Sequence, residues 1–307
     1  PRHMHFSSRR NHRAFEQWDR FCTQNGLLKK IQRSRGLNYG SMTQAALPSS
    51  LKLCHYLRDK MPLREKIFGP KVKPHKVIAH RGMSGKFPEN TLLAFDAVRH
   101  EGLRWVETDI SMLADETLIV FHDEAQGRTV AGDKLVVEAK WEDFKNADAG
   151  LWKGNQFSGQ KVLRLETLIA WAEVHDMTLI LEMKCHGNRE YRSAELLASA
   201  LRKRPKANII VSSFDLDFLG YFRMFAPHIP RASIHNFFPN DIYFLKTELA
   251  IDAVHLDSDL IAASMDVTVF HQQGIKIRAW TVNDPSRAID LFDLGVDMVM
   301  SDYPERI

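Results

Sequence analysis

The chain has few cysteines and no long apolar segment. Its 307 residues include three widely separated cysteines, Cys22, Cys54 and Cys185, which form neither a C-x-x-C pair nor a dense disulfide pattern. No hydrophobic run approaches the roughly 20 residues of a transmembrane helix, and the Arg-rich start has no apolar core typical of a secretory signal. These absences argue against a disulfide scaffold and predict a reducing, cytoplasmic setting.

Motifs of nucleotide-dependent and acyl-transfer chemistry are also absent. The sequence has no GxxxxGK[ST] loop and no GxGxxG after an expected strand, so nucleotide-dependent chemistry has no support. Ser84 and Gly85 lie near histidines in the sequence, but no G-x-S-x-G elbow surrounds the serine. Acyl transfer by a serine nucleophile is therefore not expected.

Acidic residues are scarce at the amino terminus. Residues 1–75 carry 16 Lys and Arg against 4 Asp and Glu, whereas residues 76–307 carry 26 against 34. We interpret residues 1–75 as a basic extension, partly vector-derived or disordered, because Pro1-Arg2-His3-Met4 resembles a vector remnant. Such an arm could contact acidic membrane or nucleic acid. A solvated tail is the interpretation we favour, so no nucleic-acid partner is expected and membrane contact is not favoured.

From Lys76 onward, strand signals alternate with helix signals, which predicts a parallel sheet. Eight strands suit a closed barrel, and such barrels take about 250 residues. The stretch 111–162 breaks the alternation and is interpreted as an insertion over the barrel mouth. Asn90 and Asp215 are the expected N-caps of two of the helices. The eight expected strands lie near 76–80, 104–110, 177–183, 208–213, 230–234, 252–256, 275–280 and 297–301.

The predicted fold class is therefore α/β: a TIM (β/α)8 barrel over residues 76–307, with a small insertion after the second strand and a basic N-terminal extension. Active sites of such barrels lie at the carboxyl ends of the strands. Charged residues stand at these ends. The first strand ends at His80-Arg81, the second carries Glu107 and Asp109 on one face, and the apolar run Leu118–Phe121 ends at His122. This pattern suits metal-assisted chemistry on a phosphate ester.

Three carboxylates are expected at the ends of two neighbouring strands: Glu107, Asp109 and Glu182. Unpaired, they would repel and raise one another's pKa, so one divalent cation is the expected partner. Oxygen ligands favour magnesium or calcium, with manganese as a third candidate, over zinc. The alternative pairs these carboxylates with Lys184, Arg81 or Arg278 in salt bridges without metal.

The two strand-end histidines, His80 and His122, suit proton transfer because imidazole titrates near neutral pH. Arg81 and Lys184 would neutralise phosphoryl oxygens as charge builds, and arginine suits bidentate phosphate contact. Trp280 ends the expected seventh strand, so its ring points toward the mouth or the core according to register.

A series of motifs in this order resembles the glycerophosphodiester phosphodiesterase family and is most similar to its short, cytoplasmic bacterial members. The series covers the chain from about Lys76 to the end. It comprises His80-Arg81-Gly82, Pro88-Glu89-Asn90-Thr91, Glu107-Thr108-Asp109, His122-Asp123, Leu181-Glu182-Met183-Lys184, Trp280-Thr281-Val282-Asn283 and Ser301-Asp302.

The resemblance implies a barrel of the phospholipase C-like phosphodiesterase type. It implies metal-dependent hydrolysis of small glycerophosphodiesters to glycerol 3-phosphate and an alcohol, through a cyclic phosphate or by direct attack of water. By resemblance, the catalytic pair is His80 and His122, the metal ligands are Glu107, Asp109 and Glu182, the phosphate- and substrate-binding residues are Arg81, Lys184 and Trp280, and Glu89 is supporting.

Two alternatives keep the same fold. One is a lysophospholipase D that acts on lysophospholipids at a membrane surface, using the basic arm and an aromatic stretch that includes Phe237, Phe238, Tyr243 and Phe244. The other is a non-catalytic barrel used for binding. The sequence leaves open the preferred alcohol, the native metal and the oligomeric state.

Overall fold

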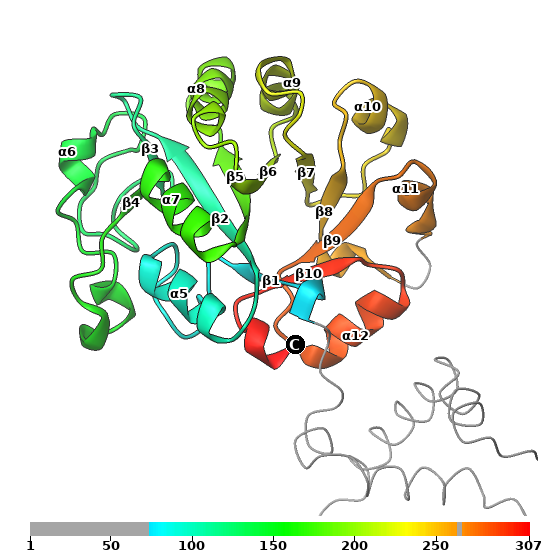
Figure 1. Ribbon diagram of the computed structural model, residues 1–307, viewed down its shortest axis with the longest axis horizontal. Helices are drawn as coiled ribbons and strands as arrows, with labels where there is room; N and C mark the ends of the chain where they lie inside the picture. Colours follow the sequence, from blue (N-terminus) through cyan, green and yellow to red (C-terminus); the bar gives the residue numbers. More distant parts are fainter. Residues whose placement is uncertain (1–73, 263–265) are drawn as a thin grey trace, which may run out of the picture. The chain divides into compact units, whose positions relative to one another are not determined.

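The computed structural model describes residues 74–262 and 266–307, so the expected basic extension lies almost entirely outside the described residues. Within the described part, eight parallel strands close into a barrel (Figure 1). Closure is made by β1 (Val77–His80), which pairs with β10 (Met298–Ser301) on one side and with β2 (Trp105–Met112) on the other. The predicted barrel is confirmed, and each strand lies within two residues of its predicted range. The other barrel strands are β5 (Thr178–Lys184), β6 (Asn208–Ser213), β7 (Arg231–His235), β8 (Ala253–Asp257) and β9 (Lys276–Trp280).

Helices connect the strands and surround the barrel (Figure 1). They are α5 (Leu92–His100), α7 (Leu165–His175), α8 (Glu190–Arg202), α9 (Leu216–Phe225), α10 (Ile242–Thr247), α11 (Thr268–Gln272) and α12 (Pro285–Asp293). Short 3-10 helices lie before β1 (η2, Pro74–Lys76), after β8 (η5, Ser258–Leu260) and after β10 (η6, Pro304–Arg306).

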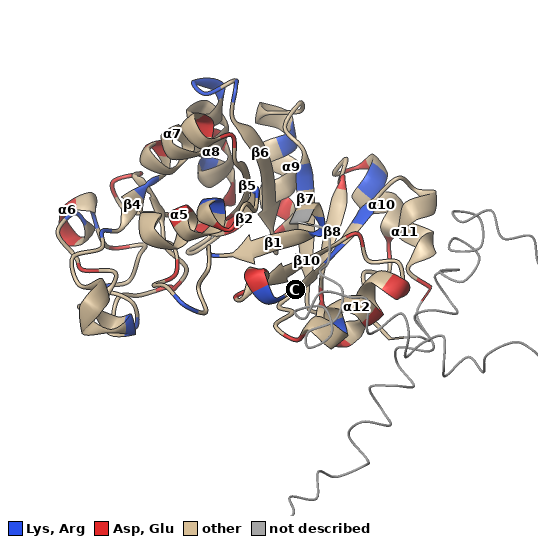
Figure 2. Ribbon diagram, turned by 60° about the horizontal axis from the view of Figure 1, so that its bottom comes forward, with Lys and Arg blue, Asp and Glu red and all other residues tan. Residues whose placement is uncertain are grey.

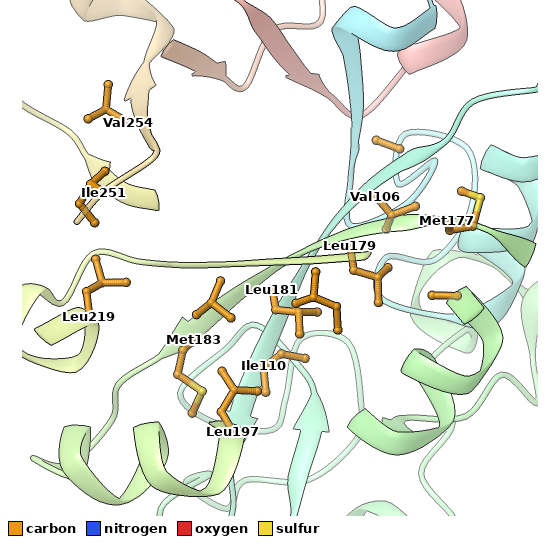
Figure 3. Packing of buried hydrophobic residues seen from close by; sticks show 14 of the residues in the cluster. Val106, Ile110, Met177, Leu179, Leu181, Met183, Leu197, Leu219, Ile251 and Val254 are labelled. Atoms are coloured by element: carbon orange, nitrogen blue, oxygen red, sulfur yellow. The ribbon is translucent and has the colours of Figure 1, made fainter. Parts of the chain in front are cut away.

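The main hydrophobic core lies between the strands and the helices. Val106 and Ile110 of β2 and Leu181 and Met183 of β5 lie in one buried cluster with Leu197 of α8 (Figure 3). Successive side chains of a strand point to opposite faces. The residues between these apolar positions, including the predicted carboxylates, therefore face the inside of the barrel.

A second buried cluster fills the barrel interior. It comprises Ile78, Ile180, Met298 and Met300, with Trp105, Ile210 and Trp280 partly buried against it. Large side chains in this place make the barrel a packed core, not a pore. The carboxylates of the predicted site therefore lie at its carboxyl end, whereas Arg278 is buried within the barrel, over the Trp105 ring and beside His255.

The segment between β2 and β5, predicted as an insertion over 111–162, has its own hydrophobic core and pairs with the end of β2. β1 ends opposite Glu107, whereas β2 continues to Met112 and pairs antiparallel with β3 (Leu118–Val120), which pairs in turn with β4 (Leu163–Arg164). Between β3 and β4 lie α6 (Trp141–Phe144), η3 (Leu151–Lys153) and η4 (Asn155–Phe157). Phe121 and Phe144 are buried in this second core, with ring centroids 5.1 Å apart. The insertion therefore fixes the backbone directly before His122.

The predicted N-cap of the first barrel helix was wrong. Thr91, not Asn90, caps α5 with its side-chain oxygen. Asn90 is occupied elsewhere: its amide donates to Asp109 Oδ2 over 2.9 Å, and its Oδ1 accepts from Thr108 Oγ1 over 2.7 Å. The side chain is thus bound to β2 and cannot cap. Asp215 caps α9 as predicted.

The turn after β1 brings the backbone close to α5. Arg81 and Gly82 have φ values of 55° and 81°. A Cβ placed on Gly82 would lie 2.8 Å from the backbone carbon of Ala94, a distance that no side chain tolerates without movement. Glycine therefore allows the close approach that holds His80 and Arg81 at the barrel mouth.

Gly82→Ala should destabilise the protein more than Gly102→Ala, which is its matched control. Gly102 has a similar φ of 75° but no heavy atom within 4 Å of an added Cβ. Its replacement should cost about 1 kcal/mol from the left-handed backbone alone, whereas Gly82→Ala adds the clash with α5. Urea unfolding of both variants measures the difference. Equal losses would contradict the role of the close approach.

Candidate active site

The candidate site lies at the carboxyl ends of β1, β2 and β5 and at the start of the segment after β3. In Figure 2, acidic and basic residues lie close together beside β2 and β5. Glu107, Asp109 and Glu182 are buried, and each offers one oxygen within 4.8 Å of the other two. The strand register explains the cluster, because Asp109 pairs with Glu182 and Glu107 shares a face with Asp109.

The three carboxylates differ in their affinity for a proton. Burial, together with the charge of Asp109, raises the pKa of Glu107 to about 8. Burial also raises the pKa of Glu182, against the opposing charge of Lys184. Burial alone would raise the pKa of Asp109, but the charges of Lys184 and Arg81 outweigh it and hold that pKa well below its ordinary value. Asp109 is therefore the carboxylate of the cluster that most readily stays ionised.

This cluster fits a divalent cation. Asp109 Oδ1 is buried and has no hydrogen-bond partner among the described residues, and the offered donors are all oxygens, which suit magnesium, calcium or manganese. Lys184 Nζ lies 3.2 Å from this oxygen and also pairs with Glu182. The salt-bridge alternative is thus partly present in the same site. Arg278, the third cation expected in the salt-bridge alternative, is buried elsewhere, beside His255.

His80 is held by a carboxylate from the far end of the chain. Its Nδ1 lies 2.7 Å from Asp302 Oδ1, and its Nε2 lies 3.9 Å from Glu107 Oε2. Asp302 is fixed in turn by Asn283, whose amide donates over 2.8 Å. Burial lowers the pKa of His80, but the hydrogen bond to Asp302 and the charge of Glu107 outweigh it, so the net shift is upward. His80 therefore tends to carry a proton.

His122 has the opposite tendency. Its Nδ1 lies 2.8 Å from Asp123 Oδ1, so Nε2 is the nitrogen left for proton transfer. Burial lowers the pKa of His122, and although Asp109 opposes this, the charges of Arg81 and Lys184 reinforce it. The two histidines share one arrangement, a carboxylate at Nδ1, but their pKa values are shifted in opposite directions.

Arg81 bridges the carboxylate cluster and the supporting residue Glu89. Its Nη1 donates to Glu89 Oε1 over 2.9 Å, and its Nε lies 3.1 Å from Asp109 Oδ2. The backbone N–H of Arg81 also donates to Glu107 Oε2 over 3.2 Å. The guanidinium is therefore fixed at the edge of the acidic cluster.

Trp280 lies at the end of β9 and forms an aromatic border to the charged site. Its ring lies 5.7 Å from that of Phe214 in an edge-to-face arrangement, and Phe214 is 45% exposed. Lys184 Nζ lies 5.9 Å from the Phe214 centroid. The aromatic pair thus places an apolar surface beside the phosphate-binding candidate on β5.

Several polar residues in the site were given no catalytic or binding role in the sequence analysis. They are Ser84, Asn90, Asp123, Arg128, Asn283 and Asp302. Asn90, Asp123, Asn283 and Asp302 lie inside the quoted motifs, so the motifs themselves were the available signal. Arg128 lies outside every motif, and no local pattern marks it.

The raised pKa of Glu107 predicts how the stability of the chelator-treated protein depends on pH. Its folded-state pKa of about 8 lies above its ordinary value of 4.5. The folded protein therefore keeps a proton that the unfolded chain has released. The free energy of unfolding should fall as the pH rises from about 5 to about 8, and Glu107→Gln should remove much of this slope.

Urea unfolding at several pH values, with chelator present, measures the slope. Glu124→Gln is the matched control, because the Glu124 side chain is 84% exposed and its loss should leave the slope unchanged. The same slope in the wild type and in Glu107→Gln would show that Glu107 does not bind the proton.

Comparison with known proteins agrees with this geometry. A family model described as "Glycerophosphoryl diester phosphodiesterase family" matches residues 80–306. A glycerophosphodiester phosphodiesterase of Bacillus altitudinis is 29% identical, over 75% of this chain and 96% of the relative. One from Caldanaerobacter subterraneus is 27% identical, over 75% of this chain and 95% of the relative. A solved phosphodiesterase of Oleispira antarctica, in complex with the product sn-glycerol 3-phosphate, is 31% identical and covers 76% of this chain and 94% of its own, with a TM-score of 0.72.

Proposed function

The chain belongs to the glycerophosphoryl diester phosphodiesterase family, and we propose that residues 76–307 hydrolyse small glycerophosphodiesters with a divalent cation and the acid–base pair His80 and His122. The products are glycerol 3-phosphate and an alcohol. One observation carries the proposal: two histidines, each bound at Nδ1 by a carboxylate, lie at the mouth that holds three buried carboxylates. The family expected from the sequence is confirmed, and its members are enzymes, so the non-catalytic alternative is set aside.

The substrate class is supported by the relatives. Their printed names specify glycerophosphodiesters, and the Oleispira structure holds sn-glycerol 3-phosphate as product. In this chain, the aromatic pair Trp280 and Phe214 offers an apolar surface for the carbon backbone of glycerol, next to the cation of Lys184. A cytoplasmic location, inferred from the cysteine pattern, stays a prediction.

Glu107, Asp109 and Glu182 would hold the cation. When bound, the cation polarises a phosphoryl oxygen and offsets the negative charge that builds on it. Arg81 and Lys184 contribute the remaining positive charge. Burial lowers the pKa values of both side chains, but the neighbouring carboxylates, Asp109 above all, outweigh it, so both pKa values are shifted upward and both side chains stay charged. Their charges are also fixed in place before the substrate arrives, which is the condition for effective electrostatic catalysis.

The two histidines divide the proton transfers. His122, with its lowered pKa, accepts the proton of the attacking hydroxyl at Nε2. His80, with its raised pKa, delivers a proton to the leaving alkoxide. A phosphorus–oxygen bond forms to the attacking oxygen, and the one to the leaving alcohol breaks. The attacking hydroxyl is either water or the neighbouring hydroxyl of glycerol, which would give a cyclic phosphate that water then opens.

Chelator-treated protein should release no glycerol 3-phosphate from glycerophosphocholine or glycerophosphoethanolamine, and magnesium, calcium or manganese should restore release. His80→Ala and His122→Ala should each lower kcat by about 100-fold or more, because each removes a proton-transfer group. His228→Ala, which changes an exposed histidine, is the control and should retain full activity. A coupled assay for glycerol 3-phosphate measures all of them. Unchanged release with chelator would contradict the metal role, and full activity in both histidine variants would contradict the pair.

A lysophospholipase D is the second candidate, and a group of exposed aromatics favours it. Phe237 is 60% exposed, Tyr243 is 72% exposed and Phe244 is 37% exposed, all in the segment after β7. Such side chains suit contact with an acyl chain or a membrane surface. No helix within residues 74–262 and 266–307 is long and apolar enough to cross a bilayer.

We expect faster turnover of glycerophosphocholine than of lysophosphatidylcholine, and no sedimentation of the protein with anionic liposomes at moderate salt. Phe237→Ser and Tyr243→Ser should leave turnover of the soluble diester unchanged. Preferred turnover of the lysolipid, lost in these two variants, would replace the first candidate by the second.

A further inference from the structure

Arg128 links two carboxylates that belong to different parts of the fold. Its Nη1 and Nη2 donate to the two oxygens of Glu89 over 2.8 and 2.7 Å, and its Nε and Nη2 donate to Asp123 over 2.8 Å each. Glu89 precedes α5, whereas Asp123 lies in the segment after β3. Paired contacts on both sides make full use of the planar guanidinium fork.

Each of these carboxylates holds a group assigned to the reaction. Asp123 binds Nδ1 of His122 over 2.8 Å, and Glu89 accepts from Nη1 of Arg81 over 2.9 Å. His122 is therefore connected to Arg81 through three side chains of alternating charge, which are Asp123, Arg128 and Glu89.

We propose that Arg128 is a positioning residue that sets His122 relative to Arg81. The inference rests on the proposed function, since it gives His122 and Arg81 their roles. Arg128 fixes Asp123, and Asp123 fixes the ring of His122. On its other side, Arg128 fixes Glu89, and Glu89 fixes Arg81.

Electrostatics explains why one cation is needed between the two carboxylates. Burial would raise the pKa values of Glu89 and Asp123, but the hydrogen bonds of Arg128 outweigh this and keep both ionised. Without Arg128, two anions would face each other, and each would be drawn toward its remaining partner. Arg128 is 45% exposed, whereas Glu89 is 10% and Asp123 20% exposed. Losing Arg128 should therefore lower stability to some degree and also displace His122.

Other contacts keep the insertion attached when Arg128 is lost. Lys153 Nζ donates to the backbone oxygen of Ser84 over 2.6 Å, and the rings of Phe157 and Phe87 lie 6.0 Å apart. The insertion also retains its own core and its pairing to β2. The effect of removing Arg128 should therefore be confined to the orientation of the site.

Arg128→Gln should lower kcat for glycerophosphocholine by about 10- to 100-fold, the usual effect of removing a partner that orients a catalytic group. KM should change much less. Arg128→Lys should recover little, because an ammonium cannot form the two paired contacts. The matched control is Arg192→Gln: Arg192 also pairs with two carboxylates, Glu116 and Glu195, with a similar 43% exposure. It should keep full kcat, and both glutamine variants should be fully folded at the assay temperature, as urea unfolding checks.

A double-mutant cycle separates positioning from a general structural effect. If Arg128 acts mainly through His122, Arg128→Gln should lower kcat much less in the His122→Ala background than in the wild type, with only the part that acts through Glu89 and Arg81 remaining. Independent, multiplicative losses would overturn the inference. So would an unchanged kcat in Arg128→Gln.

A second readout does not depend on turnover. In protein with 15N-labelled histidine, the Nδ1–H resonance of His122, assigned by its absence in His122→Ala, should be observed in the wild type and in Arg192→Gln. It should broaden or disappear in Arg128→Gln as the contact with Asp123 loosens. A wild type that releases no glycerol 3-phosphate would contradict the proposed function. An unchanged His122 resonance in Arg128→Gln would overturn the role of Arg128 whether or not the wild type is active.

Discussion

The mouth of the barrel is organised by the repulsion among three buried carboxylates within 4.8 Å of one another. Such a group is unstable unless protons or cations offset its charge. The chain uses both: Glu107 and Glu182 have raised pKa values, while Lys184 and Arg81 pair with the carboxylates. The same imbalance makes the cluster suited to a divalent cation, and it holds two cationic side chains where a phosphate would need them.

The sequence was sufficient for the features that follow from local periodicity. Alternation along β2 placed Glu107 and Asp109 on one face, and the alternation of strands with helices predicted the barrel, whose strands lie within two residues of their expected ranges. The carboxyl end of β1 also identified His80 as a candidate, because active sites of such barrels lie at the carboxyl ends of the strands. His122 follows β3, which runs antiparallel to β2, so only its apolar-to-charged pattern marked it.

Contacts between distant segments could not be predicted in the same way. His80 and Asp302 are 222 positions apart in the chain, and their contact depends on the closure of β1 against β10. Arg128 lies 39 positions from Glu89 and meets it only because the insertion folds over the turn after β1. Asn90 looked like a helix cap since the residue type suits a cap, but its tertiary bonds to β2 prevailed over the local preference.

β3 pairs with the carboxyl-terminal part of β2, Ile110–Met112, and this pairing also covers a strand edge. An uncovered strand edge offers free N–H and C=O groups to other chains and favours aggregation. β1 ends opposite Glu107, so the edge of β2 beyond that point would be open without the antiparallel cover of β3. The insertion therefore protects the barrel from edge-to-edge association while it delivers His122.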